Sequence, residues 1–435
     1  MLPNTISNWR SSIRRRFSRR EFSTSFRGKE SRVKLDLAIL NLNSIVTPVA
    51  HGPVRGRDMA RIECIKESNI GILDGKIEYV GPEIPVAEKY IDGRGLIAMP
   101  GFIDCHTHIP FTGNRSKEFL MRLEGRSYMD IMKAGGGIRS TTEAVRKAPA
   151  TSLMAESSRF LDSMLSLGVT TVEGKSGYGL DRDGELKQLR VLEALDEIHP
   201  VDVFSTFLGA HALPREYSSK DEYLSSLIET FDEVHKLTDT IDIFCEDGVF
   251  NVDQSRRYML AARDRGFRIR IHADELSSSG GGLLAVELGA VSADHLISAD
   301  DATIKALAKS DTIATLLPGT SFFLNESFAS GRELIDRGAI VAIASDFNPG
   351  SCNIYNPFIV MFLAVTRCGL KVEEAITAYT ANAAAVLGAE DRKGLIREGY
   401  DADLVLLRAG DYSEVVYNFS RDIVSNVIKS GTVIG

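Results

Sequence analysis

The stretch LIAMPGFIDCHTH, Leu96–His108, decides the fold, because the pattern of the sequence changes there. From this point on, apolar runs of strand length alternate with helical segments such as ELKQLRVLEALDEI (185–198). Eight buried strands that are each followed by a helix predict an α/β fold, a (β/α)₈ TIM-like barrel. The seven further runs are GVTTVEGKSGYG (168–179), DVFSTFLGAHAL (202–213), TIDIFCEDGVF (240–250), FRIRIHADE (267–275), AVSADHL (290–296), TIATLLPGT (312–320) and AIVAIASDFNPG (339–350).

The segments on both sides of the barrel have the pattern of short strands. LDLAILNLNSIVTP (35–48) alternates apolar and polar residues, and IGILDGKIEYVG (70–81) places two strands around Asp74-Gly75, a strong hairpin signal. Strand patterns return near the end of the chain, in GLIREGYDADLVLL (394–407) and SNVIKSGTVIG (425–435). We therefore expect a small β-sandwich domain built from both chain ends, residues 33–97 plus 394–435, beside a barrel domain of residues 98–393.

Residues 1–32 differ from the rest of the chain. Residues 1–34 hold ten Lys or Arg and two Glu, a net +8, so the remainder must carry −16 to give the total of −8. Ile6, Trp9, Ile13 and Phe17 recur at helical spacing among arginines and serines, which is typical of a mitochondrial transit peptide. The same composition also fits a disordered basic extension without a function, so both interpretations stay open.

Composition narrows the class of protein. Apolar residues make up 44% of the chain, and no apolar run approaches the ~18 residues of a membrane span, so we expect no membrane partner. The acidic body argues against a nucleic-acid partner. The five cysteines are scattered and form no C-x-x-C, which indicates reduced thiols in an intracellular protein.

Polar side chains at the carboxyl ends of the strands form the active site in this architecture. His106 and His108 share one face of the first strand, and by themselves they fit either a metal site or a pair of hydrogen-bonded histidines lining a pocket. His272 ends the fifth strand, and Asp346 ends the eighth, which lies beside the first in a closed barrel. Three histidines and one aspartate suit Zn²⁺ or Fe²⁺, so we expect one divalent or trivalent metal ion, zinc or iron.

The chain resembles the amidohydrolase superfamily of metal-dependent hydrolases over residues 33–435, and within it the imidazolonepropionase family. The first resemblance lies in the H-x-H motif, the histidine and aspartate just named, and the return strand ADLVLL (402–407). The narrower one lies in longer words that occur in this order: NRSKEFLMRLEGRSYMDIMKAGGGI (114–138), VEGKSGYGLD (172–181), FLGAHALP (207–214), DIFCEDGVF (242–250), IHADE (271–275), SADHL (292–296), LLPGT (316–320) and SDFNPGS (345–351).

The resemblance implies roles for individual residues. It implies metal ligands at His106, His108, His272 and Asp346. It implies catalytic, proton-handling roles for Glu275 and His295, with Asp346 taking part in the relay. It implies contacts with substrate or product for Arg115, Tyr178, His211, Glu275, Asn348, Gly350 and Ser351. One position departs from the family pattern, because Ile297 stands where an acidic residue usually follows SADHL, which puts a partner of His295 in doubt.

The resemblance also implies a reaction, the hydrolysis of the cyclic amide 4-imidazolone-5-propanoate to N-formimidoyl-L-glutamate in histidine degradation. The expected partner is a small molecule with a carboxylate tail, bound by a cytoplasmic homodimer; a mitochondrial location is the alternative if residues 1–30 act as a transit peptide. Two other functions remain to be separated from this one. They are a related deaminase of an aminopyrimidine or purine, and a non-catalytic scaffold that has lost its metal, against which the presence of all four candidate ligands argues.

Overall fold

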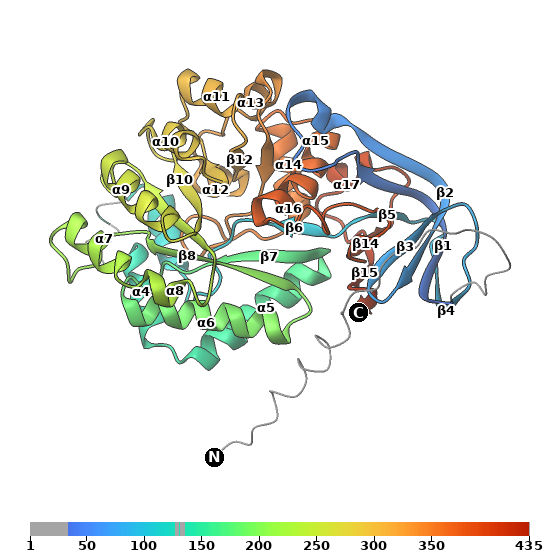
Figure 1. The fold of residues 1–435 in the computed structure, drawn as a ribbon, viewed down its shortest axis with the longest axis horizontal. Coiled ribbons are helices and arrows are strands. Elements are labelled where there is room, and N and C mark those ends of the chain that lie inside the picture. Colours follow the sequence, from blue (N-terminus) through green and yellow to red (C-terminus); the bar gives the residue numbers. More distant parts are fainter. Residues whose placement is uncertain (1–33, 127–129, 131–134, 435) are drawn as a thin grey trace, which may run out of the picture. The chain divides into compact units, whose positions relative to one another are not determined.

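The computed structural model describes residues 34–126, 130 and 135–434, and within these ranges the strands form two sheets of eight (Figure 1). One sheet is parallel and follows chain order from β6 to β13. Its ends meet, since Thr107 and Phe347 form a parallel bridge and the Asp346 amide donates to the His106 carbonyl at 3.0 Å. The predicted barrel is therefore confirmed. Its strands are β6 (Phe102–Asp104), β7 (Val169–Lys175), β8 (Asp202–Ala210), β9 (Thr240–Cys245), β10 (Arg268–Ala273), β11 (Ser292–His295), β12 (Ile313–Leu316) and β13 (Val341–Ile343).

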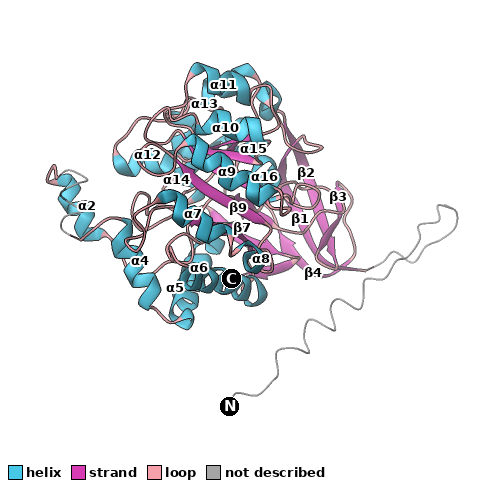
Figure 2. Ribbon diagram, turned by 60° about the vertical axis from the view of Figure 1, so that its left-hand side comes forward, coloured by secondary structure: helices cyan, strands magenta, loops and turns pink. Residues whose placement is uncertain are grey.

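Helices follow the barrel strands and cover them from outside (Figure 2). Outward-facing residues such as Ile269 and Ile271 join helical residues in the main apolar core, while residues of the opposite parity point into the barrel. The helices are α2 (Ser116–Leu123), α4 (Ile138–Lys147), α5 (Ala150–Ser166), α6 (Arg182–Ile198), α7 (Lys220–Ile228), α8 (Phe231–Val234), α9 (Val252–Arg263), α10 (Gly281–Leu288), α11 (Asp301–Leu307), α12 (Pro318–Leu324), α13 (Gly331–Arg337), α14 (Pro357–Thr366), α15 (Val372–Ala378), α16 (Ala381–Leu387) and α17 (Ser413–Tyr417).

The second sheet contains strands from both chain ends, as predicted. Its order is β16-β15-β14-β5-β1-β2-β3, and β4 pairs with the first half of the long strand β1. Strands of the two ends share an apolar core, in which Ile39 and Ile70 lie with Leu404 and Ile428. The strands are β1 (Leu35–Pro48), β2 (Ile62–Leu73), β3 (Lys76–Gly81), β4 (Ala87–Asp92), β5 (Ile97–Pro100), β14 (Leu404–Leu407), β15 (Val424–Lys429) and β16 (Thr432–Ile434), with a 3₁₀ helix η1 (Gly56–Ala60).

Strand β5 of this sheet leads directly into β6 of the barrel, so the second sheet fixes the start of the segment that carries His106. None of the helices in the described ranges is both long and apolar enough to cross a bilayer. The transit-peptide and disordered-extension interpretations both concern residues 1–32, which lie outside the described residues.

Candidate metal centre and active site

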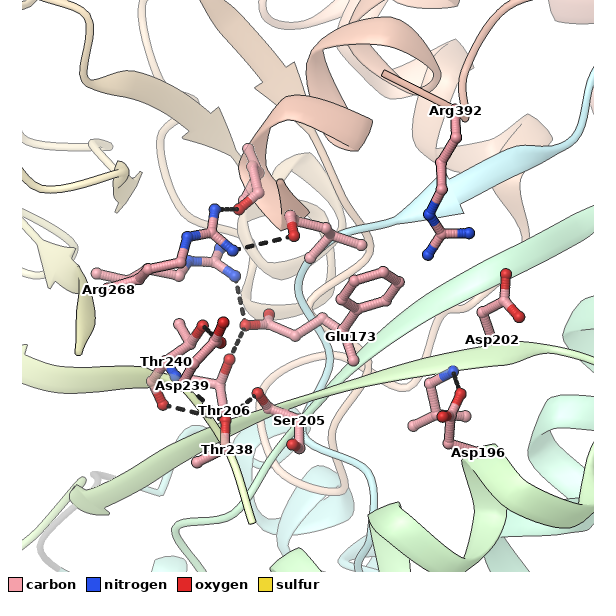
Figure 3. A pocket seen from close by; sticks show the side chains of 15 residues that line it. Glu173, Asp196, Asp202, Ser205, Thr206, Thr238, Asp239, Thr240, Arg268 and Arg392 are labelled. Carbon is pink, nitrogen blue, oxygen red and sulfur yellow. Dashed lines mark hydrogen bonds and ion pairs between the residues drawn. The ribbon is translucent and has the colours of Figure 1, made fainter. Parts of the chain in front are cut away.

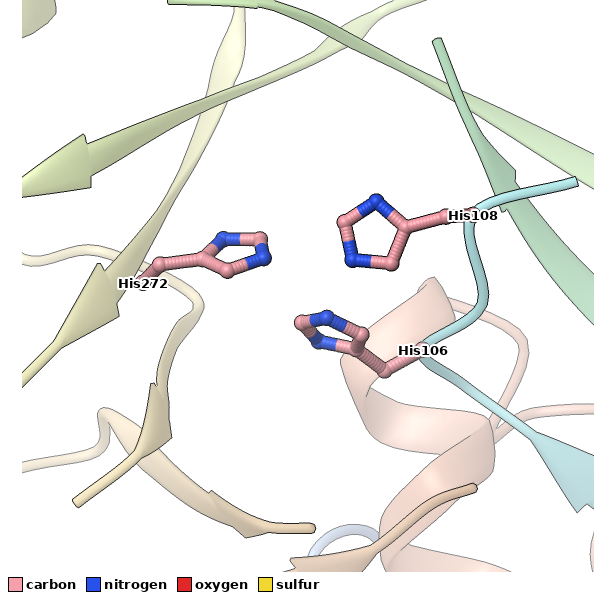
Figure 4. A group of neighbouring side chains, drawn as sticks. All are labelled: His106, His108 and His272. Carbon is pink, nitrogen blue, oxygen red and sulfur yellow. The ribbon is translucent and has the colours of Figure 1, made fainter. Parts of the chain in front are cut away.

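Three histidines meet at the carboxyl end of the barrel (Figure 4). The ring centroids of His106 and His272 are 4.6 Å apart, and that of His108 is 5.4 Å from the first and 5.5 Å from the second. Asp346, which follows β13, has its Oδ1 atom 3.1 Å from His108 Nε2 and 3.6 Å from His106 Nε2. The structure thus brings the four expected ligands together, and each is at most 3% exposed.

The free atoms of this group fit a metal ion. His106 Nε2, His272 Nε2 and Asp346 Oδ1 are buried and have no hydrogen-bond partner among the described residues. Ligand-type atoms of His106, His108 and His272 all lie within 4.8 Å of one another. Buried polar atoms without partners are costly unless something fills the space between them, and nitrogen and carboxylate oxygen atoms are the usual ligands of zinc and iron. Burial also keeps the pKa of His106 and of His108 well below the ordinary value, so both are neutral and able to act as ligands.

Two carboxylates hold the far side of these histidines. Asp294 Oδ2 lies 2.7 Å from His106 Nδ1, and Asp242 Oδ2 lies 2.9 Å from His272 Nδ1. Burial disfavours the charged form of His272, but Asp242 outweighs it and the pKa of His272 is raised. A carboxylate at Nδ1 orients the ring and leaves Nε2 for the metal. Both aspartates lie on inward-facing strand positions, which the period-two alternation of a strand could have indicated.

Glu275 and His295 form a pair of titratable groups beside the ligands. His295 Nε2 lies 3.6 Å from Glu275 Oε2, and the Glu275 side chain is 12% exposed. Burial, with the nearby charge of Asp346, raises the pKa of Glu275 to about 8, and burial lowers the pKa of His295 to about 3. The raised pKa suits Glu275 to proton transfer near neutral pH, whereas His295 remains a neutral imidazole that can donate a hydrogen bond. His295 has a φ of 76° and Asp346 a φ of 56°, uncommon values that cluster at functional sites.

The loop after β13 is organised by one amide side chain. Asn348 donates from Nδ2 to the Asp346 carbonyl at 2.7 Å and accepts at Oδ1 from the amides of Gly350 and Ser351 at 2.8 and 2.7 Å. The Thr320 hydroxyl donates to Asp346 Oδ2, which leaves Oδ1 facing the histidines. Asn348, Gly350 and Ser351, to which the resemblance assigns contacts with substrate or product, therefore fix the backbone next to the candidate metal ligand Asp346.

The remaining expected residues lie around the same centre. His211 stacks on His108 with ring centroids 5.1 Å apart, and Tyr178 lies 5.5 Å from His211. Arg115 directly precedes α2 and contacts Glu118, with its Nε and Nη2 atoms 2.9 and 2.7 Å from Oε2. The guanidinium has five N–H donors, so the contact with Glu118 leaves donors that can bind a ligand. The half-buried Ile297 follows β11, and the carboxylates of Glu275 and Asp346 both lie near His295.

The comparisons with known proteins agree with this geometry. The family model described as Amidohydrolase family matches residues 97–434. The imidazolonepropionase of Kosmotoga olearia is 59% identical over 92% of this chain and 99% of its own, and that of Bacteroides thetaiotaomicron is 45% identical over 91% and 98%. A zinc-bound adenosine deaminase from Xanthomonas campestris has the same fold, with a TM-score of 0.68 at 19% identity over 92% of this chain and 93% of that one. The chain therefore belongs to the amidohydrolase family and, within it, to the imidazolonepropionases.

Proposed function

We propose that this chain hydrolyses 4-imidazolone-5-propanoate to N-formimidoyl-L-glutamate, a step of histidine degradation, with one zinc or iron ion. The observation that carries the proposal is a buried group of three histidines and one aspartate, with an arginine packed against Gly350 in the loop after that aspartate, in a chain that matches imidazolonepropionases over nearly its full length. The structural likeness to an adenosine deaminase extends to the fold alone, at 19% identity, so it gives the deaminase alternative no separate support.

His106, His108, His272 and Asp346 would hold the metal ion. When bound, a metal ion of this kind supplies Lewis-acid chemistry, because it lowers the pKa of a water molecule and polarises a carbonyl oxygen. Asp294 and Asp242 lie against Nδ1 of His106 and of His272 and would orient these two rings. Burial keeps the pKa of His106 and of His108 well below the ordinary value, so both remain neutral. Zinc and iron both accept this set of ligands, so the choice between them belongs to experiment.

The reaction adds water across the ring amide. An oxygen atom of water bonds to the ring carbonyl carbon, the bond from this carbon to the ring nitrogen breaks, and the nitrogen leaves as part of the formimidoyl group. A proton must leave the water and another must reach the nitrogen. Glu275 can carry out both transfers in turn, because its raised pKa allows it to accept and release a proton near neutrality. His295, which burial keeps neutral, can donate a hydrogen bond to the carbonyl oxygen as negative charge develops there.

The propionate tail of the substrate requires a cation at the mouth of the barrel. Arg115 offers a planar guanidinium, which binds a carboxylate through two parallel hydrogen bonds. Its position is fixed from two sides, by Glu118 and by the backbone of Gly350. Arg122 donates to the Gly350 carbonyl at 3.1 Å and balances the charge of Glu118, so the group of three side chains keeps a net positive charge for the substrate.

The test is turnover of freshly prepared 4-imidazolone-5-propanoate beside a panel of cyclic amides, aminopyrimidines and aminopurines. We expect ring opening of the first and no ammonia release from the aminopyrimidines or aminopurines. Stripping the metal with a chelator should abolish the activity, and restoring zinc or iron one at a time should identify the ion. Ammonia release from an aminopyrimidine or aminopurine, with no ring opening, would instead establish the deaminase function. The homodimer expected from the resemblance stays a prediction, and a cytoplasmic location is part of the proposal.

A further inference from the structure

The middle of the barrel interior is built from charged side chains. In barrels of this class the inward-facing positions are usually filled by branched apolar residues. Here they are occupied by residues from four strands that are each at most 1% exposed: Glu173, Lys175, Asp242, Arg270 and Asp294. Removing charges from water is costly unless they are paired, so the burial of these five charged side chains needs a physical explanation.

The five side chains form one connected ionic layer. Lys175 Nζ lies 3.0 Å from Glu173 and 2.9 Å from Asp242. Arg270 donates to Asp294 at 2.7 Å and also to Glu173. Three carboxylates and two cations thus hold one another, with one negative charge in excess.

The upper side of this ionic layer contacts the candidate metal ligands. The Asp294 Oδ2 atom that faces His106 Nδ1 is the atom that accepts from Arg270. In the same way, the Asp242 Oδ2 atom that faces His272 Nδ1 is the atom held by Lys175. Arg270 therefore reaches His106, and Lys175 reaches His272, each through a single carboxylate oxygen. Lys175 also lies 3.9 Å from Asp294 Oδ2. An acceptor at Nδ1 fixes the proton there and leaves Nε2 as the ligand atom.

The lower side of the ionic layer faces a cavity of about 340 Å³ at the opposite end of the barrel (Figure 3). Glu173 is held there by the Thr206 hydroxyl at 2.5 Å and by Arg270. Arg268 also lines this cavity, and it donates to the Val386 and Leu387 carbonyls at 3.0 Å. The layer thus separates the candidate metal centre from this cavity and is anchored on both sides.

We infer that Lys175 and Arg270 are positioning residues of the metal centre, which act through Asp242 and Asp294 on His272 and His106. The two cations hold the carboxylates in the one arrangement that presents both histidines with Nε2 toward the ion. They set the affinity and the coordination geometry of the metal, and they do not touch the substrate. The inference rests on the metal centre of the proposed function.

The chain provides a matched control in a second buried lysine. Lys393 is 3% exposed and pairs with Asp202 and with Asp403, the latter at 2.5 Å, in a cluster between the start of β8 and the second sheet. The substitutions Lys175→Met and Lys393→Met each remove one cation from a buried ion pair. Lys393→Met leaves the carboxylates that face His106 and His272 unchanged. The two substitutions separate a structural effect from an effect on the metal.

The experiment measures Co²⁺ binding by the full chain after removal of its metal, by competition with a chelator and by visible absorption of the bound ion. Binding of one Co²⁺ by the wild-type chain tests the metal centre itself. We expect Lys175→Met to raise the Kd for Co²⁺ by ~10–100-fold, the usual effect of losing an outer-shell partner, and to change the absorption spectrum. Lys393→Met should leave both unchanged, although it too lowers the thermal midpoint.

A wild-type Kd and spectrum in Lys175→Met would overturn the inference, whatever its thermal midpoint. If Lys175→Met does not fold, Asp242→Asn takes its place, because it keeps the shape of the side chain and removes the charge that joins Lys175 to His272. The same ~10–100-fold loss of affinity is then expected. An Asp242→Asn chain with wild-type Co²⁺ affinity would contradict the inference as directly.

Discussion

The guanidinium of Arg115 occupies the space that a side chain on Gly350 would fill. Arg115 begins the segment of α2, and Gly350 belongs to the loop after β13 that also carries Asp346. Arg122, which lies in the last turn of α2, donates to the Gly350 carbonyl. The loop that carries the candidate ligand Asp346 is therefore packed, at Gly350, against the proposed carboxylate anchor Arg115, and this packing can be tested.

Gly350→Ala should displace Arg115, because the added methyl group overlaps the guanidinium. We expect KM for 4-imidazolone-5-propanoate to rise by roughly tenfold or more, as for a lost charge-assisted hydrogen bond, while the metal content stays at one ion per chain. Steady-state kinetics and elemental analysis measure the two effects. Gly410→Ala is the control, since among the described residues its methyl group would meet the Glu414 carboxylate alone. Equal KM values in the two variants would remove the argument for this contact.

Arg115→Ala tests the anchor itself. A bidentate pair with a carboxylate contributes about 1.5–3 kcal/mol, so KM should rise by about 10–150-fold for the natural substrate. A substrate analogue without the propionate carboxylate should show almost no difference between the wild type and the variant. If both substrates lose the same factor, Arg115 acts on the fold of the site and not on the carboxylate.

Glu275→Gln should retain the metal and lower kcat by ~10²–10⁴, the usual contribution of a general base. The raised pKa of about 8 also sets the direction of the pH profile. Because the base acts in its deprotonated form, wild-type activity should increase with pH well above the ordinary Glu value of ~4.3 and level off once the carboxyl group is ionised. The residual activity of the variant should lack this rise. Loss of the metal in Glu275→Gln would assign the residue to the ligands instead.

Sequence patterns predicted the barrel and the second sheet because both rest on local periodicity. The apolar runs mark all eight strands, and the strand ends alone indicated His106, His108, His272 and Asp346. The ionic layer was not predicted, since Glu173, Lys175, Asp242, Arg270 and Asp294 each resemble an ordinary polar residue in a strand. Their meeting depends on barrel closure and on which side of each strand faces inward, information that one strand does not contain.

Asp401 forms ion pairs that join segments far apart in the sequence. Its carboxylate lies 2.5 Å from Lys76 in β3 and 2.7 Å from Arg392, so it joins the N-terminal hairpin to the C-terminal return. These partners outweigh burial and lower its pKa to about 2. A depressed pKa contributes stability above the unfolded value of ~3.9, which is lost as the pH falls toward 2.

Asp401→Asn should therefore lower the free energy of unfolding by about 2 kcal/mol at pH 7, and the difference from the wild type should shrink between about pH 5 and pH 2. Denaturant unfolding at several pH values measures it. Asp92→Asn is the control, because Asp92 is a surface carboxylate whose ion-pair partner within the described part of the chain is its near neighbour Arg94. A difference that stays constant with pH would show that Asp401 stabilises the fold by shape and not by charge.

The most direct test of the proposed hydrolysis is the fate of the oxygen atom of water. The full-length, metal-loaded chain is given 4-imidazolone-5-propanoate in H₂¹⁸O, and the product is analysed by mass spectrometry with fragmentation. The proposal predicts N-formimidoyl-L-glutamate with one ¹⁸O in the carboxylate formed from the ring carbonyl, at a rate that Glu275→Gln lowers by ~10²–10⁴. Unchanged substrate, or a labelled product from which ammonia has been lost, would contradict it.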